Sequence, residues 1–300
     1  MIRSNEPLRA RNSFRIGGCA RELAAPASLT ELGDVLRSAH RDGVPVFALG
    51  GGTNTLLADD GFAGLVLSFE NLVDDVIPAT DPYRLIVRAG TPLKRVIHEA
   101  LRRGWEGLEY FVGIPGTIGG AVYGNAGTRG HELGALVERL HVFDRRGVDR
   151  WIAGAELPWE YRASGLGADL VAEVVLRLQP GDRRLIADRA RDLFNRKRLT
   201  QPLHEASAGC VFRNPEGLHA GALIERAGLK GLAIGGARVS DRHANFVVND
   251  GTATAADVER LLAHVSQVVN QLFAVSLQRE IVTPGADGLG IRTSRGSKDS

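Results

Sequence analysis

The chain is poor in cysteine and carries almost no excess charge. Its 300 residues include two cysteines, Cys19 and Cys210, which are too few for a disulfide framework or a cysteine-rich metal centre. The 8 histidines show no metal-binding spacing, so we expect no metal site. A formal net charge of +2 argues against nucleic acid as the main partner.

Long apolar runs are also missing. No stretch approaches the roughly 18 apolar residues of a membrane span, and residues 1–6 lack the apolar run of a signal peptide. We therefore expect a cytoplasmic protein that has no membrane partner. The hydrophobic fraction of 44% is typical of soluble globular proteins, and 300 residues suit two or three domains.

Glycine, by contrast, is concentrated in two segments. The first is Gly50-Gly51-Gly52-Thr53-Asn54, and the second is Gly113–Gly127, with 6 glycines. Glycine gives up side-chain packing, but it lets the main chain approach a ligand and point N–H groups at an anion. Either segment alone is compatible with a tight turn, whereas the two together indicate a long ligand held at two places.

The first glycine segment does not have the G-x-G-x-x-G spacing of a Rossmann dinucleotide fold. No amphipathic helix follows Gly52 either, and that fold needs one. Hydrophobic periodicity nevertheless predicts a mixed α/β chain. Helices are expected after a capping box at residues 28–31, and over residues 92–103, 185–199, 222–227 and 255–272. Strands are expected over residues 44–49, 65–67, 85–88, 137–143, 170–178, 237–239, 245–248 and 275–282.

Several motifs in collinear order resemble the UDP-N-acetylenolpyruvoylglucosamine reductase (MurB) family. They lie at residues 12–18, 50–57, 107–120, 161–164, 207–215, 221–231, 239–246 and 280–282. The resemblance covers about residues 10–284, and this many motifs in order are highly specific.

The resemblance implies an α+β fold with a two-part FAD-binding module of the vanillyl-alcohol-oxidase (PCMH) type and a C-terminal α+β substrate-binding domain. We expect the FAD-binding module over residues 1–180, in two subdomains of about 1–70 and 71–180. The substrate-binding domain is expected over 181–284, followed by a disordered tail over 285–300. The inserted tyrosine-bearing loop of the larger type is not recognised, which indicates the shorter type.

The family's reaction implies what the protein has to do. NADPH reduces FAD, and FAD then reduces UDP-N-acetylglucosamine enolpyruvate to UDP-N-acetylmuramate in peptidoglycan precursor synthesis. Negative charge develops on the carboxylate side of the substrate, and one carbon must receive a proton. The expected partners are therefore small molecules, the UDP-sugar and NADPH, and we expect a monomer.

Three residues match the family's catalytic positions. Cys210 stands where the family has a serine or cysteine proton donor, and a thiol with an ordinary pKa of about 8.5 stays mostly protonated at neutral pH. Arg162 matches an arginine that would favour the enolate-like state, and Glu280 matches a glutamate that stabilises the same intermediate. Taken singly, each has an ordinary structural alternative: a small buried hydrophobe, a surface ion pair and a solvated strand face.

The cofactor and substrate contacts also follow from the resemblance. FAD would be lined by Gly50, Gly51, Gly52, Thr53, Asn54, Gly113, Pro115, Gly116, Thr117, Gly119 and Gly120. The UDP-sugar would be held by Tyr161, Arg213, Asn214, Glu225 and Lys230. Gln278 and Tyr123 depart from the usual family pattern without removing a group that has a named chemical role.

Two other readings remain open. One is a different oxidase on the same flavin scaffold, acting on an alcohol with oxygen. The other is a catalytically silent UDP-sugar sensor. An assay for flavin and for substrate-dependent NADPH oxidation separates all three.

Overall fold

The computed structural model describes residues 2–73, 77–78, 82–128 and 130–291. The chain divides into two compact units. Unit 1 comprises Met1–Ser4, Glu22–Gly51 and Gly64–Lys197, and unit 2 comprises Asn5–Arg21, Gly52–Ala63 and Arg198–Ser300. The chain therefore passes between the units inside the first glycine segment, after Gly51.

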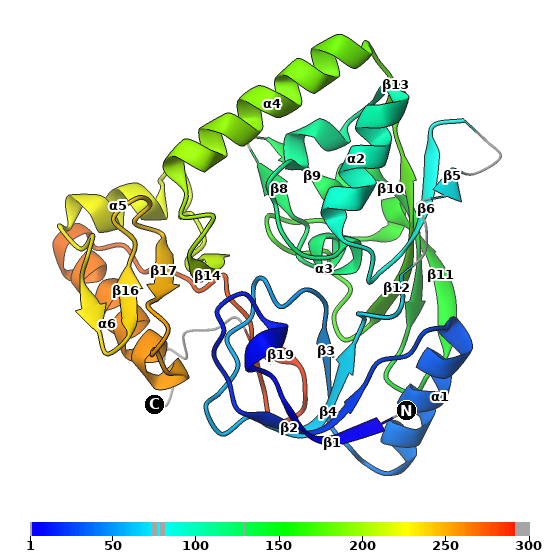
Figure 1. Cartoon of the computed structure of the whole chain (residues 1–300), viewed down its shortest axis with the longest axis horizontal. Coiled ribbons are helices and arrows are strands. Elements are labelled where there is room, and N and C mark those ends of the chain that lie inside the picture. The colour runs from blue at the N-terminus through cyan, green and yellow to red at the C-terminus, as the bar shows by residue number, and fades with distance from the viewer. Residues whose placement is uncertain (1, 74–76, 79–81, 129, 292–300) are drawn as a thin grey trace. The chain divides into compact units, whose positions relative to one another are not determined.

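The main sheet of unit 1 is antiparallel. Its order is β11 (Asp149–Ala153), β10 (Val137–Phe143), β12 (Leu170–Arg177), β6 (Arg84–Arg88) and β5 (Ile77–Pro78). Leu140 of β10 pairs with Val174 of β12, which confirms that these two predicted strands share one sheet. Helices α2 (Leu93–Arg103) and α3 (Ile118–Tyr123) lie beside the sheet (Figure 1).

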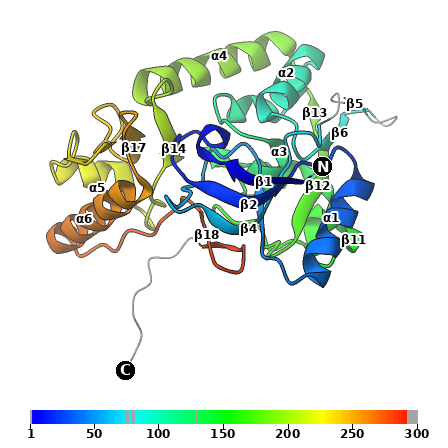
Figure 2. The same ribbon diagram turned by 60° about the horizontal axis from the view of Figure 1, so that its bottom comes forward.

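A second sheet has the order β1 (Ile2–Pro7), β2 (Cys19–Ala24), β4 (Phe62–Ser68) and β3 (Val46–Leu49), and Figure 2 shows β1, β2 and β4 side by side. Helix α1 (Leu29–Arg41) starts where the capping box predicts, with Ser28 as its N-cap. The sequence analysis missed β1 because nearly all of this strand is exposed, so its residues show no apolar alternation.

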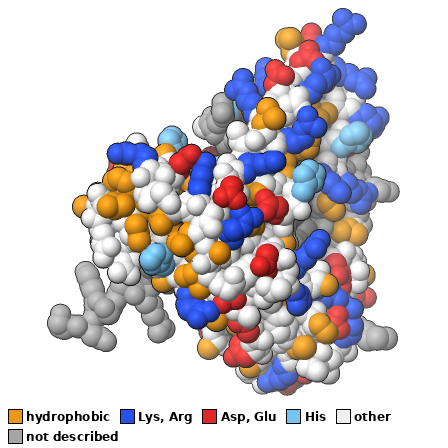
Figure 3. Space-filling model, turned by 60° about the vertical axis from the view of Figure 1, so that its left-hand side comes forward, with side chains coloured by type: hydrophobic (Ala, Val, Ile, Leu, Met, Phe, Trp, Pro, Cys, Tyr) orange, Lys and Arg blue, Asp and Glu red, His pale blue; other side chains and the backbone are white. Residues whose placement is uncertain are grey.

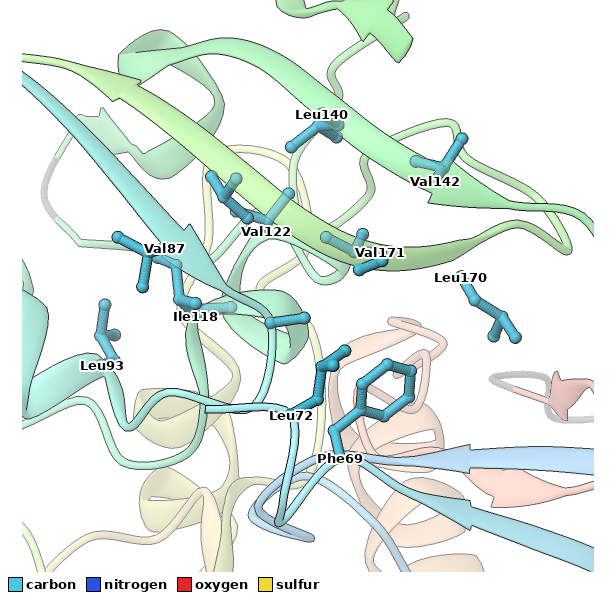
Figure 4. Close-up of a cluster of buried hydrophobic side chains, with 14 of the residues drawn as sticks. Phe69, Leu72, Val87, Leu93, Ile118, Val122, Leu140, Val142, Leu170 and Val171 are labelled. Carbon is cyan, nitrogen blue, oxygen red and sulfur yellow. The ribbon is translucent and has the colours of Figure 1, made fainter. Parts of the chain in front are cut away.

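The core of unit 1 fixes the second glycine segment in place. Figure 4 shows Ile118 and Val122 of α3 among Leu140, Val142, Leu170 and Val171 of the sheet and Leu93 of α2. Ile118 and Val122 are fully buried. Each large aliphatic side chain buried in this way contributes about 1.5–3 kcal/mol. The glycine segment is thus anchored by the apolar residues within it.

Helix α4 (Arg183–Thr200) is the longest helix of unit 1 and reaches into unit 2 at its last turn. It buries few side chains, chiefly Ile186 and Ala190. The predicted helix over residues 185–199 is confirmed to within two residues.

Unit 2 contains a four-stranded sheet of order β14 (Ala206–Cys210), β17 (Phe246–Asn249), β16 (Ala237–Val239) and β15 (Ala233–Ile234). Helix α5 (Ala220–Arg226) and the longer α6 (Ala255–Phe273) complete its core. Thr254 and Asp257 form a full capping box at the start of α6. The predicted helices and the strands at 237–239 and 245–248 are confirmed to within two residues.

The predicted strand over residues 275–282 is not a regular strand. Only Arg279 and Val282 form isolated bridges, to Phe212 and to Thr55. The reason is that this segment divides its hydrogen bonds between two partners. Gln278 and Glu280 bond to Arg213 and Val211, whereas Val282 bonds to Asn54 and Leu56.

Short pairs complete the fold. They are β7 (Trp105–Glu106) with β13 (Gln179–Pro180), β8 (Gly127–Thr128) with β9 (His131–Glu132), and β18 (Thr283–Pro284) with β19 (Gly290–Ile291). The rest of the predicted tail, residues 292–300, lies outside the described residues.

The surface charge and the apolar character of the helices bear on possible partners. On the face drawn in Figure 3, acidic side chains lie among the basic ones. Across the described part of the chain, no helix has the length and apolar character needed to cross a bilayer.

Candidate active site

The two glycine segments touch each other inside unit 1. A Cβ atom added to Gly51 would lie 2.8 Å from the Cα of Gly116, and one added to Gly50 would lie 2.7 Å from Oγ1 of the Thr117 side chain. Real Cβ contacts are not this short. At Gly51 the two main chains therefore approach each other at a distance that only glycine permits, and Gly50 lies against the Thr117 side chain.

The second glycine segment is tied to the turn between β6 and α2. Leu93 N donates to Gly116 O, Ile118 N donates to Thr91 O, and Gly119 N donates to Ala89 O, all at 2.9 Å. The Thr117 side chain accepts a hydrogen bond from Gly120 N and so caps α3. Pro115 and Gly120 are exposed. The segment is thus held rigidly while one side of it faces outward.

The first glycine segment has backbone N–H groups that are available to bind a ligand. Gly52 O accepts hydrogen bonds from the backbone and side chain of Ser13. Within the residues the structure describes, however, the N–H groups of Gly51, Gly52 and Thr53 donate to no other group. A run of such N–H groups suits a diphosphate. Together with the close main-chain contact in unit 1, these donors fit an extended cofactor such as FAD.

Arg162 lies at the tip of a tight turn in unit 1. Glu160 and Ala163 exchange two backbone hydrogen bonds of 2.9 and 3.0 Å, which leaves Tyr161 and Arg162 between them. Arg162 has a left-handed backbone, with φ of 61°, which is uncommon for a residue other than glycine. Its Nη2 donates to Gly127 O at 3.0 Å, and its guanidinium lies 4.9 Å from the ring centre of Tyr161.

Asn125 holds this turn, and the sequence analysis gave it no role. It is fully buried. Its Nδ2 donates to Glu132 Oε2 at 2.9 Å and to Glu160 O at 2.8 Å, and its Oδ1 accepts from Gly134 N at 3.0 Å. One side chain therefore connects the Arg162 turn, β9 and the 3-10 helix that follows β9. The only signal in the sequence is a polar residue inside a glycine-rich run.

Lys197 is a second residue that the sequence analysis missed. It lies in the last turn of α4, is half-buried, and its Nζ donates to Val112 O at 2.7 Å. A Cβ atom at Gly113 would lie 3.1 Å from the Lys197 Cδ, so the lysine stem packs on the second glycine segment. Burial, with a smaller effect from the charge of Arg162, lowers the pKa of Lys197 to about 8.

In unit 2 the backbone brings Cys210 and Glu280 together. Cys210 ends β14 and pairs with Phe246 of β17. The next residue, Val211, accepts a hydrogen bond from Glu280 N at 2.9 Å, and Arg213 N donates to Gln278 O at 2.8 Å. Both Cys210 and Glu280 are half-buried. Asn54 joins them, because its Nδ2 donates to Glu280 O at 3.2 Å.

The predicted substrate-binding residues divide between the units. Tyr161 of unit 1 is 41% exposed. In unit 2, Asn214 accepts a hydrogen bond from Ala220 N and so caps α5, whereas Glu225 and Lys230 form an ion pair of 2.6 Å. Arg162 belongs to unit 1, and Cys210, Arg213 and Glu280 belong to unit 2.

His243 lies near that ion pair in unit 2. Burial is the largest cause that lowers the pKa of this histidine, followed by the charge of Lys230. Its Nδ1 accepts a hydrogen bond from Asn245 N at 3.2 Å, which suits the neutral ring. The ring therefore braces the turn before β17.

Comparison with known proteins gives two family models. The model described as "FAD binding domain" matches residues 20–150. The model described as "UDP-N-acetylenolpyruvoylglucosamine reductase, C-terminal domain" matches residues 201–283. They confirm the expected fold class, an FAD-binding module of the PCMH type followed by a separate C-terminal α+β domain.

Full-length relatives and a solved structure agree with these models. UDP-N-acetylenolpyruvoylglucosamine reductase 2 of Symbiobacterium thermophilum is 41% identical over 282 residues, covering 93% of this chain and 91% of the relative. The corresponding reductase of Methylococcus capsulatus is 42% identical over 278 residues, covering 92% and 91%. The crystal structure of UDP-N-acetylenolpyruvylglucosamine reductase (MurB) from Thermus caldophilus matches with a TM-score of 0.80 at 33% identity, covering 94% of this chain and 98% of that one.

Identity above 40% across nine-tenths of both chains, with the same fold in a solved structure, leaves no other assignment. The chain belongs to the UDP-N-acetylenolpyruvoylglucosamine reductase (MurB) family.

Proposed function

We propose that this protein catalyses the NADPH-dependent reduction of UDP-N-acetylglucosamine enolpyruvate to UDP-N-acetylmuramate, using FAD, in peptidoglycan precursor synthesis. The observation that carries the proposal is the contact between two glycine segments in unit 1, within a chain whose family consists of reductases of this substrate. A hydrophobic core is normally filled by side chains, so a contact between two glycine-rich main chains indicates a binding site.

FAD would be held along the two glycine segments. The N–H groups of Gly51, Gly52 and Thr53 would donate to its diphosphate, and residues from Gly113 to Gly120 would also contact the cofactor. When bound, FAD supplies the redox chemistry, accepting reducing equivalents from NADPH and passing them to the enolpyruvyl group. The protein's own residues supply binding, charge and a proton.

Arg162 would bind the substrate carboxylate. A guanidinium offers a fixed fork of N–H donors that fits two carboxylate oxygens, and its charge favours the state in which negative charge has moved onto the carboxylate side. The contacts with Gly127 O and the Tyr161 ring support this role, because they fix the orientation of the side chain. Preorganised charge of this kind lowers the barrier without reorganisation during the reaction.

Cys210 would donate the proton to the substrate carbon. A protonated thiol carries the proton that the reaction needs. Its place at the end of β14, directly before the residue bonded to Glu280, supports a shared task for the two side chains. Glu280 would stabilise the enolate-like state by hydrogen bonding in its protonated form.

The UDP-sugar would be held by Tyr161, Arg213, Asn214, Glu225 and Lys230. Lys230 already pairs with Glu225 in the structure. A diphosphate bound there would compete with the Glu225 carboxylate for the ammonium group. Because binding of the diphosphate would break the ion pair with Glu225, we expect Lys230 to contribute only modestly to the affinity for the UDP-sugar.

Further properties are proposed with the function. Helix α4 ends at Thr200 and β14 begins at Ala206, so only a short link separates them, which supports the shorter family type. We also propose that the enzyme works as a monomer in the cytoplasm, where its nucleotide substrates are made and where free thiols such as Cys19 and Cys210 stay reduced.

The test is a coupled assay on purified protein. We expect a yellow protein that releases FAD on denaturation and oxidises NADPH only when UDP-N-acetylglucosamine enolpyruvate is added. Mass spectrometry should show a product two hydrogen masses heavier than the substrate. A colourless protein that cannot be reconstituted with FAD, or NADPH oxidation that ignores the substrate, would contradict the proposal.

A further inference from the structure

Tyr123, the last residue of α3, makes a contact that the proposed reaction does not use. Its hydroxyl donates a hydrogen bond to Gly167 O at 3.0 Å. Gly167 ends the loop of residues 160–167, named the Arg162 loop after the proposed carboxylate-binding residue. Tyr123 is 37% exposed, so it is not a core residue. The tyrosine therefore connects the helix of the second glycine segment to the loop that carries Arg162.

Two further contacts join the same two parts of unit 1. Asn125 Nδ2 donates to Glu160 O at 2.8 Å. Arg162 Nη2 donates to Gly127 O at 3.0 Å. Tyr123, Asn125 and Gly127 are every second residue along the chain, and each contacts the Arg162 loop. The chain that leaves α3 therefore holds this loop at its first residue, at Arg162 itself and at its last residue.

The Arg162 loop forms neither a helix nor a regular strand. Gly165 and Gly167 have left-handed backbones, with φ of 73° and 59°, so the chain changes direction twice before β12 begins. Leu166, between them, is buried in the core of unit 1. The Tyr123 hydrogen bond holds the residue next to this anchor. An irregular segment depends on such contacts for its position, because it lacks the repeating hydrogen bonds of a helix or sheet.

We propose that Tyr123 is a positioning residue for Arg162: its hydroxyl fixes the last residue of the Arg162 loop and so sets the orientation in which the guanidinium meets the substrate carboxylate. The inference rests on the proposed function, which assigns Arg162 to that carboxylate. Tyr123 acts through the loop and needs no contact with substrate or flavin. Because α3 belongs to the second glycine segment, one continuous stretch of chain holds both the predicted cofactor contacts and Arg162.

The effect of Tyr123 should be selective for ligands that carry the enolpyruvyl carboxylate. A guanidinium held in one orientation offers two parallel N–H groups to a carboxylate, and a small rotation weakens one of these hydrogen bonds. UDP-N-acetylglucosamine has no such carboxylate. Loss of the Tyr123 hydroxyl should therefore weaken binding of the enolpyruvyl substrate and leave binding of UDP-N-acetylglucosamine unchanged, whereas a general loss of structure would weaken both.

The experiment compares Tyr123→Phe, which removes only the hydroxyl, with Tyr110→Phe. The second variant is the matched control, since it removes a hydroxyl of unit 1 that accepts a hydrogen bond of 2.9 Å from Arg189. Titration calorimetry on the proteins with FAD bound and without NADPH gives the Kd of the enolpyruvyl substrate and of UDP-N-acetylglucosamine. Rapid-mixing absorbance gives the rates of flavin reduction by NADPH and of flavin reoxidation by the enolpyruvyl substrate.

We expect Tyr123→Phe to raise the Kd of the enolpyruvyl substrate and to slow flavin reoxidation by about threefold to tenfold each, as for one lost hydrogen bond. Its Kd for UDP-N-acetylglucosamine and its reduction by NADPH should match those of the parent. In the Arg162→Ala background, Tyr123→Phe should change the Kd of the enolpyruvyl substrate no further, because the residue that it positions is missing. Tyr110→Phe should leave all four quantities unchanged.

Three results would overturn the inference: parent-like values in Tyr123→Phe, equal weakening of both ligands, or an undiminished loss in the Arg162→Ala background. Bound FAD and circular dichroism verify the fold of each variant. Reductase activity in the parent with an unaffected Tyr123→Phe variant refutes only the role of Tyr123. Selective weakening of the enolpyruvyl ligand in a protein that does not oxidise NADPH refutes only the proposed reaction, and a parent protein that binds neither ligand refutes both.

Discussion

The two units hold their proposed catalytic residues by different means. In unit 2, Cys210 and Glu280 are placed by the main chain, through the pairing of β14 and the hydrogen bonds from Glu280 N and Arg213 N. In unit 1, Arg162 lies in a short turn closed by Glu160 and Ala163, and side-chain hydrogen bonds support that turn, from Asn125 to Glu160 O and from Arg162 to Gly127 O. A backbone ladder survives most substitutions, whereas one buried amide does not. Substitution of Cys210 or Glu280 in unit 2 should thus lower the reaction rate while leaving the backbone in place. Substitution of a supporting residue such as Asn125 in unit 1 should instead displace Arg162.

The largest expected effect is that of Cys210→Ala. Because β14 is held by its backbone, this variant should keep its fold and its reduction by NADPH while losing about 100-fold or more in substrate reduction, as for a missing general acid. Rapid-mixing absorbance measures the two half-reactions separately. Cys210→Ser should recover much of the rate, since a hydroxyl can donate the same proton. Full rates in both half-reactions of Cys210→Ala would remove Cys210 from the mechanism.

Asn125→Ala tests the opposite behaviour in unit 1. Loss of the buried amide removes one of the two hydrogen bonds that Glu160 O accepts and leaves Gly134 N without its partner, so we expect about 1–3 kcal/mol lower stability and about tenfold lower kcat/KM. Asn249 of unit 2 is the matched control. It is also buried, and it bonds to Phe14 O, Gly251 N and Ala253 N.

Asn249→Ala should therefore cost similar stability in chemical denaturation and leave kcat/KM nearly unchanged. Repeating Asn125→Ala in the Arg162→Ala protein separates an effect on the position of Arg162 from a general loss of stability. If Asn125 acts through Arg162, Asn125→Ala should lower kcat/KM much less in that background than in the parent enzyme. Equal losses in both backgrounds would show that Asn125 supports the fold alone.

Gly51→Ala should affect cofactor binding more than stability. The added Cβ would meet Gly116 Cα at 2.8 Å, so the two glycine segments must separate. We expect FAD affinity to fall by about tenfold, because the cost of separation is of the order of 1–2 kcal/mol for an overpacked contact. Fluorescence titration of the FAD-free protein gives the Kd, and an unchanged value would mean that the contact does not shape the cofactor site.

The smallest effects concern acid stability and compare two helices. Hydrogen bonding to Arg102 is the largest cause that lowers the pKa of Glu99 of α2 to about 2, whereas backbone hydrogen bonding at Thr254 does so for Asp257 of α6. Both carboxylates therefore stabilise the fold above their ordinary pKa near 4, and the contribution is lost as the pH falls toward 2.

Glu99→Gln should lower the Tm by about 1 °C at pH 6, as for a helix ion pair, and by less at pH 2, where the Glu99 carboxyl is partly protonated. High salt should erase the loss in Glu99→Gln but only part of the loss in Asp257→Asn, because Asp257 bonds to the main chain at Thr254 as well as to Arg260. Equal salt sensitivity in the two variants would contradict this distinction between the units.

The sequence analysis succeeded where a pattern repeats along the chain. Helices α1 and α6 follow from their capping residues and apolar spacing, and the pairing of β10 with β12 follows from two apolar strands. It failed where a residue acts through a main-chain carbonyl. Asn125 bonds to Glu160 O and Lys197 bonds to Val112 O, and every residue has such an oxygen. Periodicity and motif spacing contain no information about which carbonyl a side chain will reach.

The prediction of a strand over residues 275–282 was wrong for a related reason. Its apolar alternation predicts a strand, but its backbone divides its hydrogen bonds between residues 211–213 and 54–56. Alternation indicates which side chains are buried and does not indicate how many partners the backbone has. The isolated bridges that result are nevertheless what brings Glu280 beside the chain that carries Cys210.

An anaerobic titration of the bound flavin in two steps tests the central claim most directly. NADPH should bleach the flavin absorbance, and UDP-N-acetylglucosamine enolpyruvate added afterwards should restore it in equal molar amount, with UDP-N-acetylmuramate as the product. A flavin that NADPH reduces but that stays bleached in the presence of this substrate would contradict the account.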